Sequence, residues 1–334
     1  MTPTIGVFDS GFGGLTVLRA LLTRLPNANY AFLGDTARLP YGSKSRRTIA
    51  RYAAESAQFL VQKQGAQFLV VACNTASALA LDAIQAAVPV PVLGVIEPGA
   101  AAARGASRTG DVLVVATDAT VQSHAYATAC RAQGMRAIEK ACPLLVPLVE
   151  EGWTGHPVTA EVIRIYLAEL LAEAAELDMR PDTLVLGCTH YPLLRPLLEA
   201  AVPPGMKVID SAEATAEAAA RLFGQKSASR SPSLDGRDES EDLDLVTAEM
   251  QIVEDSFPQE LMPAILPAAP GTAQFAPGDQ ADAARGVLTQ GDISFGDPAQ
   301  IRCFATDSVE KFERLGSRFL GRDTGPVALV DLGG

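Results

Sequence analysis

The sequence holds few of the residues that build disulfide-rich or metal-binding proteins. Its 334 residues include five cysteines and three histidines, and no two cysteines form a CxxC pair. An odd, scattered set of cysteines argues against a disulfide framework and against a standard zinc site. We therefore expect free thiols in a reducing compartment, each of which must be explained by packing or by chemistry.

Long apolar runs are also missing. The longest candidate, AIQAAVPVPVLGVIEPGAAAA (83–103), is interrupted by prolines and by Glu97, whereas a bilayer span needs about 20 consecutive apolar residues. The first residues, MTPTIGVFDS, lack the basic start and the apolar run of a signal peptide. We expect a soluble cytoplasmic protein that does not bind a membrane.

Positive charge is scarce, and the negative charge is unevenly placed. The formal net charge is −12, and residues 225–300 alone hold 14 acidic and 4 basic residues. The sequence shows neither a basic stripe nor a cluster of stacking aromatics, so no nucleic-acid partner is expected. The segment 225–300 opens with QKSASRSPSLDGRDESEDLD, a composition typical of a disordered or flexible linker. The rest of it mixes apolar patches with Pro and Gly, and we assign it no fold.

Up to about residue 223, short apolar runs alternate with helical patterns. A strand and an amphipathic helix are expected again in IRCFATDSVEKFERLGSRFLG (301–321). This alternation predicts an α/β fold with largely parallel sheets, in which sites gather at the carboxyl ends of strands. The earlier expected strands are TIGVF (4–8), NYAFLG (29–34), AQFLVVA (66–72), VPVLGVI (90–96), DVLVVA (111–116), RAIEKA (136–141), DTLVLG (182–187) and MKVID (206–210).

Two cysteines lie in matching sequence frames. FLVVACNTAS (68–77) and TLVLGCTHYP (183–192) both run from an apolar strand through a small residue to a cysteine, a polar pair and a helix start. A single cysteine at a strand end is commonly a small buried hydrophobe. Two in the same frame, each at a helix N-terminus that favours thiolate, indicate related half-sites that face one cleft. Cys130, Cys142 and Cys303 are interpreted as packing residues.

Several kinds of site use two thiols, and they differ in how far apart the cysteines lie in the sequence and in how many other ligands they need. A disulfide exchanger needs adjacent cysteines, and a metal site needs more ligands than Cys188 and His190 supply. An enzyme that inverts a stereocentre needs a base on one face of a carbon and an acid on the other. A thiol, with an ordinary pKa of about 8.5, can serve in both forms. Cys73 and Cys188 therefore favour a racemase, with a thiol- or metal-binding regulatory protein as the alternative.

Five motifs follow one another along the chain: IGVFDSGFGGLTVL, GDTARLPYGSKS, VVACNTAS, CPLLVPLVEEG and LVLGCTHYPLL. Together they resemble the bacterial glutamate racemases of the cofactor-independent aspartate/glutamate racemase group, over residues 4–223 and again near 301–322. The resemblance implies two pseudo-symmetric α/β domains with the active site in the cleft between them. The first domain would be discontinuous, formed by 1–97 and 210–334 with the acidic insertion at about 225–300. The second would be formed by 98–209.

The resemblance also implies an activity, the reversible interconversion of L- and D-glutamate to supply D-glutamate for peptidoglycan. Proton transfer at the α-carbon would need no pyridoxal phosphate, metal or nucleotide. By resemblance, Cys73 acts on the α-proton of D-glutamate and Cys188 on that of L-glutamate; the residues alone do not say which face each serves. Aspartate or another acidic amino acid is the alternative substrate. Homodimers are common in the family, so a homodimer is expected.

The supporting residues follow from the same resemblance. Asp9 is expected beside Cys73, where it orients the substrate ammonium or moves its proton, and Glu150 and His190 are expected near Cys188. SGFGGL (10–15) lets backbone N–H groups approach an anion but is not a dinucleotide fingerprint. The expected substrate-binding set has no Arg or Lys, so anions should be bound by neutral donors and aligned dipoles. It consists of Asp9, Ser10, Tyr41, Gly42, Asn74, Thr75, Thr189 and His190, with Thr117 and Thr120 equally well explained as helix caps.

Overall fold

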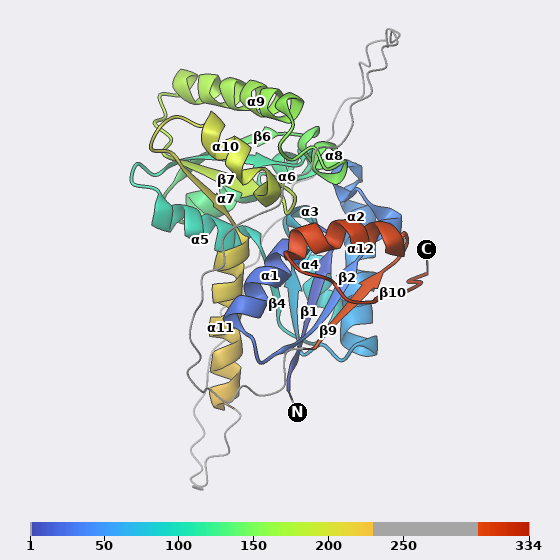
Figure 1. The fold of residues 1–334 in the computed structure, drawn as a ribbon. Helices are drawn as coiled ribbons and strands as arrows, with labels where there is room; N and C mark the ends of the chain where they lie inside the picture. The colour runs from blue at the N-terminus through green and yellow to red at the C-terminus, as the bar shows by residue number, and fades with distance from the viewer. Residues whose placement is uncertain (1, 230–299, 334) are drawn as a thin grey trace, which may run out of the picture. The chain divides into compact units, whose positions relative to one another are not determined.

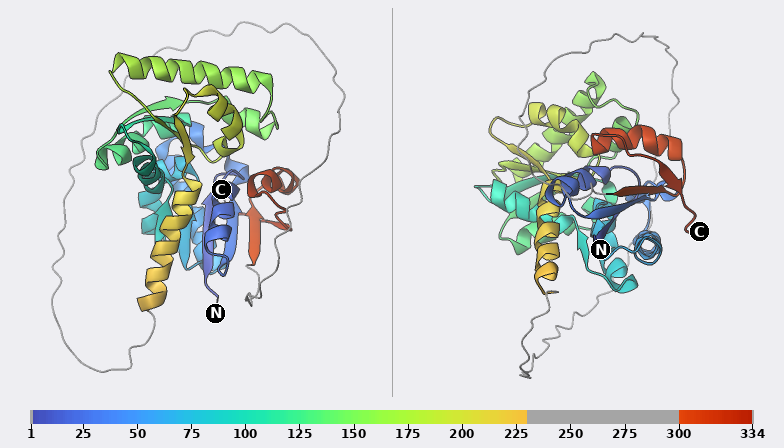
Figure 2. Two further views of the ribbon diagram at one scale, coloured as in Figure 1. Left: turned by 60° about the vertical axis from the view of Figure 1, so that its left-hand side comes forward. Right: turned by 60° about the horizontal axis from the view of Figure 1, so that its bottom comes forward.

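The computed structural model describes residues 2–229 and 300–333 and contains two β-sheets (Figures 1 and 2). The larger sheet has the strand order β10-β9-β2-β1-β3-β4, and the smaller has the order β6-β5-β7-β8. Each strand pairing is parallel. The predicted α/β class with parallel sheets is therefore confirmed. The division into domains 1–97 with 210–334 and 98–209 stays a prediction.

The strands lie where the apolar runs predict them, with one addition. The short strand β10 was not predicted; it pairs with β9, with Val327 opposite Cys303. Its only sequence signal is the three-residue run VAL before a polar chain end. The strands are β1 (Thr4–Asp9), β2 (Asn29–Gly34), β3 (Phe68–Val71), β4 (Val92–Gly94), β5 (Asp111–Ala116), β6 (Arg136–Ala141), β7 (Thr183–Gly187), β8 (Lys207–Asp210), β9 (Ile301–Ala305) and β10 (Val327–Leu329).

Helices connect most of these strands. The α-helices are α1 (Leu15–Arg24), α2 (Arg46–Gln58), α3 (Asn74–Leu79), α4 (Leu81–Ala87), α5 (Ile96–Ala106), α6 (Asp118–Gln122), α7 (Ala125–Ala132), α8 (Leu145–Glu150), α9 (Pro157–Glu176), α10 (Arg195–Ala201), α11 (Ala212–Ser229) and α12 (Val309–Leu320). Shorter helical turns are η1 (Thr36–Arg38), η2 (Tyr41–Ser43), η3 (Phe59–Lys63) and η4 (Tyr191–Leu194). Among the described helices, none is both long and apolar enough to cross a bilayer.

The larger sheet is covered on both faces because successive strand residues point to opposite sides. Val7 and Phe32 belong to one buried cluster, which includes Leu18 of α1 and Phe312 of α12. Their neighbours Phe8 and Leu33 belong to a second cluster with residues of α2 and α4. Such strands are apolar throughout, which is typical of parallel sheets buried on both faces.

The smaller sheet follows the same rule. Leu113 and Leu184 pack with residues of α9 and α10, whereas Val112 and Val185 pack with residues of α5 and α7. Cys130 of α7 is fully buried in this second cluster, in line with its interpretation as a packing residue. Cys303 of β9 is likewise buried in the core of the larger sheet.

The chain returns to the larger sheet after residues 230–299, which lie outside the described residues. Helix α11 continues to Ser229, so the prediction of a linker from residue 225 is wrong for residues 225–229. Gln, Lys and Ala are good helix formers, and they extend the helix beyond the point where its apolar pattern ends. The linker prediction for the rest of the segment is not tested by the described residues.

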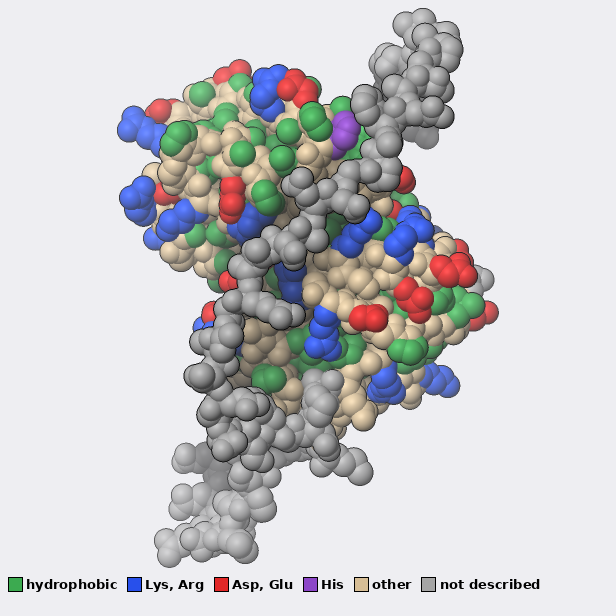
Figure 3. Space-filling model, viewed as in Figure 1, with side chains coloured by type: hydrophobic (Ala, Val, Ile, Leu, Met, Phe, Trp, Pro, Cys, Tyr) green, Lys and Arg blue, Asp and Glu red, His purple; other side chains and the backbone are tan. Residues whose placement is uncertain are grey.

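Charges of both signs are interspersed on the surface of the described residues in the view of Figure 3. Several of them form pairs between elements distant in sequence, such as Arg24 with Glu217 at 2.6 Å. Both side chains of that pair are about half exposed, so it adds little to stability. The surface charge therefore contributes little to holding the fold, and apolar packing supplies most of the stability.

Candidate active site

A cavity of about 540 Å³ lies where strands of both sheets end. Its lining includes residues directly after β1, β3, β5, β6 and β7, the place where parallel α/β sheets bind ligands. Eleven of the thirteen site residues predicted from the sequence line it: Ser10, Tyr41, Gly42, Cys73, Asn74, Thr75, Thr117, Glu150, Cys188, Thr189 and His190. The two predicted cysteines thus share one cavity.

Cys73 forms the N-cap of α3. Its sulfur accepts the backbone N–H of Ala76 at 3.4 Å, and its thiol donates to Ser10 Oγ at 3.4 Å. Burial, followed by the charge of Asp9, raises the pKa of Cys73 to about 12, and the hydrogen bonds from the loop and helix do not offset this. The expectation that the helix terminus favours thiolate is wrong for Cys73, because desolvation outweighs one short turn of helix.

Cys188 follows β7 but has no α-helix of its own. The chain continues through Thr189 and His190 into the 3₁₀ helix η4 and then α10, so a helix follows the polar pair as predicted, but it begins as a 3₁₀ turn. Its nearest charged partner is instead His190, whose Nδ1 lies 3.9 Å from the Cys188 sulfur. The two half-sites therefore share a position at a strand end and differ in what surrounds the sulfur.

His190 links Cys188 to Glu150. Its Nε2 lies 3.3 Å from Glu150 Oε1, an ion-pair distance without the alignment of a hydrogen bond. Burial lowers the pKa of His190, but the partnership with Cys188 and Glu150 outweighs it and raises that pKa to about 10. A protonated His190 between the two groups stabilises negative charge on Cys188. The sequence predicted both residues near the site but not this order of contacts.

Lys311 adds a fourth residue to the contacts among Cys188, His190 and Glu150. It was not predicted from the sequence. Its Nζ donates to Glu150 Oε2 at 3.1 Å, and it lies in α12, which follows the long segment 230–299. Burial raises the pKa of Glu150, but His190 and Lys311 outweigh it and hold that pKa below its ordinary value. No local pattern marks Lys311, because its partner lies 161 residues away in sequence.

Asp9 lies behind the cavity wall and does not line it. Its Oδ2 accepts the N–H of Gly11 at 2.9 Å, and its Oδ1 has no hydrogen-bond partner among the described residues. Burial raises the pKa of Asp9, and the charge of His190 partly offsets this. The predicted direct contact with a substrate ammonium is therefore absent from this structure, since the carboxylate is fully enclosed. Its predicted influence on Cys73 by charge remains open.

Three threonines form a cluster beside Cys73. Thr75 Oγ1 lies 2.9 Å from Thr117 Oγ1 and 3.3 Å from Thr120 Oγ1, and the last two lie 2.9 Å apart. Thr117 caps α6 and also lines the cavity, so both of its interpretations hold. Thr120 is fully buried and does not reach the cavity, so its predicted contact with substrate is wrong. It positions the other two hydroxyls.

Asn74 has one amide donor that is left without a partner in the described ranges. The hydroxyl of Tyr126 donates to Asn74 Oδ1 at 2.7 Å, which fixes the amide with its nitrogen on the other side. Asn74 Nδ2 is buried and has no hydrogen-bond partner among the described residues. A buried donor of this kind is costly unless a ligand or water accepts from it. Asn74 is therefore poised to bind an acceptor such as a carboxylate.

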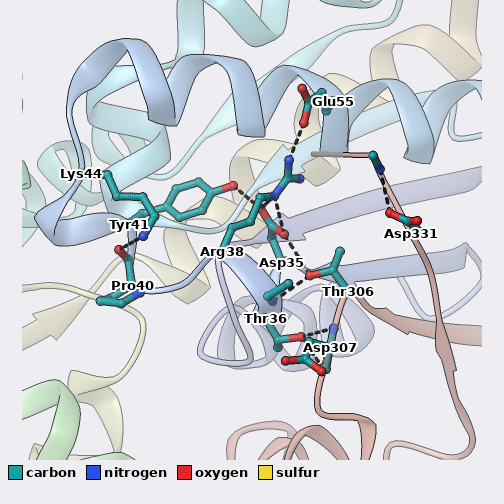
Figure 4. A network of polar contacts seen from close by, with 12 residues as sticks. Asp35, Thr36, Arg38, Pro40, Tyr41, Lys44, Glu55, Thr306, Asp307 and Asp331 are labelled. Carbon is teal, nitrogen blue, oxygen red and sulfur yellow. Dashed lines mark hydrogen bonds and ion pairs between the residues drawn. The ribbon is translucent and has the colours of Figure 1, made fainter.

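Tyr41 lines the cavity with its ring, but its hydroxyl points elsewhere. The hydroxyl donates to Asp35 Oδ2 at 2.5 Å, and Asp35 also accepts from Arg38 and from Thr306 (Figure 4). The contact of Tyr41 with substrate stays a prediction and would have to use the ring or the backbone, because the hydroxyl donates to the buried carboxylate of Asp35. The loop of Tyr41 is thereby tied to the chain after β9. Gly42 of this loop lies against Thr117, where an added Cβ would be 3.1 Å from Thr117 Cβ.

Replacing Tyr41 with Phe tests this orientation. We expect the Michaelis constant to stay within about twofold, because the ring remains in the cavity wall. The free energy of unfolding should fall by about 1–2 kcal/mol, because the buried Asp35 loses one of its donors. Steady-state kinetics and chemical denaturation measure the two effects. A Michaelis constant raised tenfold or more would show that the hydroxyl serves the substrate after all.

Some lining residues were not predicted as part of the site. Cys142, interpreted above as a packing residue, and Glu151, which was given no role in the site, both reach the cavity wall; Cys142 is fully buried and Glu151 exposed. The others, except Asp118, lie within the quoted motifs, so proximity to a motif was the available signal; Asp118 follows the predicted Thr117. They are Gly11, Leu39, Pro40, Ser43, Asp118, Pro143, Val146, Pro147 and Tyr191.

The cavity wall contains acidic and neutral polar side chains. Among the described residues that line it there is no Lys or Arg, and nowhere in the described ranges do three His, Cys, Asp or Glu side chains form a possible metal site. Proton transfer by thiols, with neutral donors to receive anionic groups, is chemistry that these lining residues can carry out.

Two comparisons by sequence relate the chain to known proteins. The Asp/Glu/Hydantoin racemase family matches residues 5–219. Glutamate racemase of Koribacter versatilis is 48% identical over 334 residues, which cover 99% of this chain and 98% of that protein. Glutamate racemase of Syntrophus aciditrophicus is 52% identical over 221 residues, 66% of this chain and 79% of that protein. The first of these alignments spans the segment 225–300, so the insertion is not peculiar to this chain.

Solved structures give the same assignment. Glutamate racemase from Francisella tularensis, determined with D-glutamate, superposes with a TM-score of 0.71 at 27% identity and covers 99% of this chain and 98% of that one. Glutamate racemase from Thermus thermophilus, determined with β-chloro-D-alanine, gives a TM-score of 0.68 at 34% identity with the same coverage. The sequence match and the near full-length relative lead to one conclusion: the chain belongs to the Asp/Glu/hydantoin racemase family.

Proposed function

We propose that this protein interconverts L- and D-glutamate by proton transfer between its α-carbon and two cysteines. The observation that carries the proposal is that Cys73 and Cys188, which end strands of different sheets, line one cavity. A relative that matches almost the whole chain at 48% identity is a glutamate racemase. An isomerase of this kind needs two acid–base groups on opposite faces of one carbon, and the cavity supplies a candidate from each sheet.

The proton balance of the reaction requires opposite protonation states at the two sulfurs: one must be a thiolate and the other a thiol. From L-glutamate, the Cys188 thiolate takes the α-proton, and the Cys73 thiol gives its proton to the opposite face of the carbon. The reaction then leaves a Cys188 thiol and a Cys73 thiolate, and the reverse direction restores the first state. The high pKa of Cys73, about 12, keeps it protonated before the reaction. His190, whose pKa is raised to about 10 by its partnership with Cys188 and Glu150, places a positive charge beside Cys188.

Neutral donors would hold the two carboxylates of glutamate. Asn74 lines the cavity and has a buried amide donor, Nδ2, without a partner among the described residues; Thr75 and Thr117, whose hydroxyls contact each other, line it too. Ser10 and Thr189 also line the wall. Such fixed donors in a cavity that excludes water stabilise the negative charge that develops during proton removal.

No cofactor is assigned to the reaction. Pyridoxal phosphate acts through a lysine that forms a Schiff base, and no lysine lines the cavity among the described residues. The activity would supply D-glutamate for peptidoglycan. By resemblance to the family we also propose that the protein forms a homodimer in the cytoplasm, and sedimentation equilibrium of the purified protein would test the dimer.

Chiral chromatography of reactions with purified protein and no added cofactor tests the proposal. L-Glutamate and D-glutamate should each approach an equal mixture of the two enantiomers. The rate with L-aspartate should be at least about a hundredfold lower, because aspartate lacks one methylene and cannot place both carboxylates on the same donors. Faster racemisation of aspartate would assign the alternative substrate, and no racemisation of either would overturn the proposal.

A further inference from the structure

Helix α12 forms part of the structure behind His190. The ring of Phe319 meets the His190 ring edge to face at 5.1 Å, and Phe12 lies 6.2 Å from His190 and 6.0 Å from Phe319. From the same helix, Lys311 donates to Glu150 of α8 at 3.1 Å (Figure 1 shows the two helices). One helix therefore contacts the imidazole directly and reaches the carboxylate that pairs with it.

Lys311 is not placed there to stabilise its own helix. It is the third residue of α12, where the positive end of the helix dipole disfavours a cation. Its side chain is 40% exposed, whereas that of Glu150 is 14% exposed. A pair this close to the surface adds little to stability. What it does fix is the orientation of Glu150, whose second oxygen faces His190.

We propose that Lys311 is a positioning residue for racemisation: by holding Glu150 against His190, it keeps the imidazole in place beside the sulfur of Cys188. The proposal rests on the proposed function and extends it to the segment that follows residues 230–299. The row of contacts runs from Lys311 Nζ to Glu150, from Glu150 to His190 Nε2 and from His190 Nδ1 to Cys188. In the described ranges no comparable row lies beside Cys73, whose hydrogen bonds are with Ser10 and Ala76.

Because the row of contacts lies beside Cys188 and not beside Cys73, a positioning role should affect one proton-transfer step. A purely structural role should affect both. The equilibrium constant between enantiomers is one, so a variant must change the ratio of kcat to KM equally in both directions. The two proton-transfer steps, one at each cysteine, can be slowed to different extents. If Lys311 acts through Cys188, its loss leaves the step at Cys73 unchanged and slows the proton transfer at Cys188, for removal and delivery alike. That step then limits the rate, and the primary isotope effect of the α-deuterated substrate rises for one enantiomer.

The pH dependence gives a second readout. His190 faces Cys188 of its own turn, Glu150 of α8 and Asp9 of β1, and Glu150 faces His190 and Lys311 of α12. Without the cation of Lys311, the Glu150 carboxylate is less stabilised, and its pKa rises. Protonated Glu150 no longer supports a charged His190, so the acidic limb of the rate profile should move to higher pH.

The experiment compares the full-length variants Lys311→Met and Lys311→Arg with Arg314→Met. Arg314 lies on the same helix and is exposed, so its variant removes one positive charge from α12 without touching Glu150. We expect Lys311→Met to lower kcat about tenfold with KM changed less than twofold. The isotope effect should rise with α-deuterated L-glutamate, if Cys188 serves that enantiomer. It should fall towards one with the D-enantiomer, because Cys73 removes that deuterium in a step that no longer limits the rate. Lys311→Arg should restore most of the rate.

Three results would overturn the proposal: kcat unchanged in Lys311→Met, isotope effects altered equally for both enantiomers, or the same loss in Arg314→Met. The proposal would also fail if Lys311→Met lost activity only because the protein unfolds, as a lowered melting temperature would show. In that case Lys311→Arg would not restore activity at a temperature at which the Lys311→Arg protein is folded. The wild-type protein run in parallel tests the proposed function separately. If it does not racemise glutamate, that function fails, whatever the variants do.

Discussion

Replacing either Cys73 or Cys188 with alanine is expected to lower glutamate racemisation by about a thousandfold or more. Each thiol supplies the acid in one direction and the base in the other, and a positioned acid or base contributes roughly 10²- to 10⁴-fold to a rate. Because each turnover uses both thiols, each single variant should lose nearly the whole activity in both directions. Both side chains are almost fully buried, so their loss also leaves a small cavity, at a cost of about 1 kcal/mol.

Hydrogen exchange in the same variants distinguishes the two sulfurs. The Cys73→Ala protein retains Cys188 and should still exchange the α-proton of one enantiomer with solvent deuterium, without inverting it. The Cys188→Ala protein should do so with the other enantiomer. By the family resemblance these are L-glutamate and D-glutamate, respectively. Nuclear magnetic resonance of the α-proton in deuterated buffer measures the exchange.

Matched controls are available in the same chain. Cys130 is buried in the smaller sheet's core and does not line the cavity, so Cys130→Ala should keep its activity while losing a similar amount of stability. Cys→Ser at either site should leave the shape of the cavity intact and still weaken proton transfer. Near-normal racemisation by Cys73→Ala or Cys188→Ala would rule out a two-cysteine mechanism.

Replacing Gly13 with alanine should give the next largest loss of activity, about a hundredfold. A Cβ at Gly13 would collide with Thr189 Oγ1 and lie 2.7 Å from His190 Nδ1. His190 would have to shift away from Cys188, and a displacement of about 1 Å near a reacting group can lower a rate by about 10²-fold. The cost in stability should be only about 1–3 kcal/mol, because the neighbours can move.

Gly105→Ala is the control for this variant. Gly105 lies in α5, and nothing stands within 4 Å of a Cβ built there. This change should leave activity unaltered and stabilise the protein by about 0.5–1 kcal/mol, since alanine is the better helix former. Kinetics and thermal unfolding of the two variants together separate the effects. A Gly13→Ala protein with more than half the normal rate would show that the turn around Gly13 does not fix His190.

The sequence was enough to predict the fold and the two cysteines, because both leave local patterns. Short apolar runs between helical patterns give parallel strands, and the repeated frame around Cys73 and Cys188 gives two equivalent positions at strand ends. Sites in such sheets lie beyond the carboxyl ends of the strands, so each cysteine is expected at the functional edge of its sheet. The matching frames then indicate that the two edges share one cavity. The family resemblance supplied nine further lining residues, fewer than half of the others.

Features that depend on long-range contacts could not be predicted in this way. The hydroxyl of Tyr41 turns to Asp35 because Arg38 and Thr306 also converge there (Figure 4), and Thr306 comes from beyond the long insertion. Lys311 comes from the same distant part of the chain. The raised pKa of Cys73 depends on how completely the fold encloses it, which a helix start in the sequence does not reveal.

The central claim, that two groups exchange protons with opposite faces of the α-carbon, is tested most directly with wild-type protein in deuterated water. Each enantiomer of glutamate is offered separately, and product and remaining substrate are separated early in the reaction. The account predicts one deuterium at the α-carbon of almost every product molecule and almost none in the recovered substrate, from either enantiomer. Deuterium that enters recovered substrate as fast as product, or a product that keeps the original proton, would mean that one base serves both faces and would contradict it.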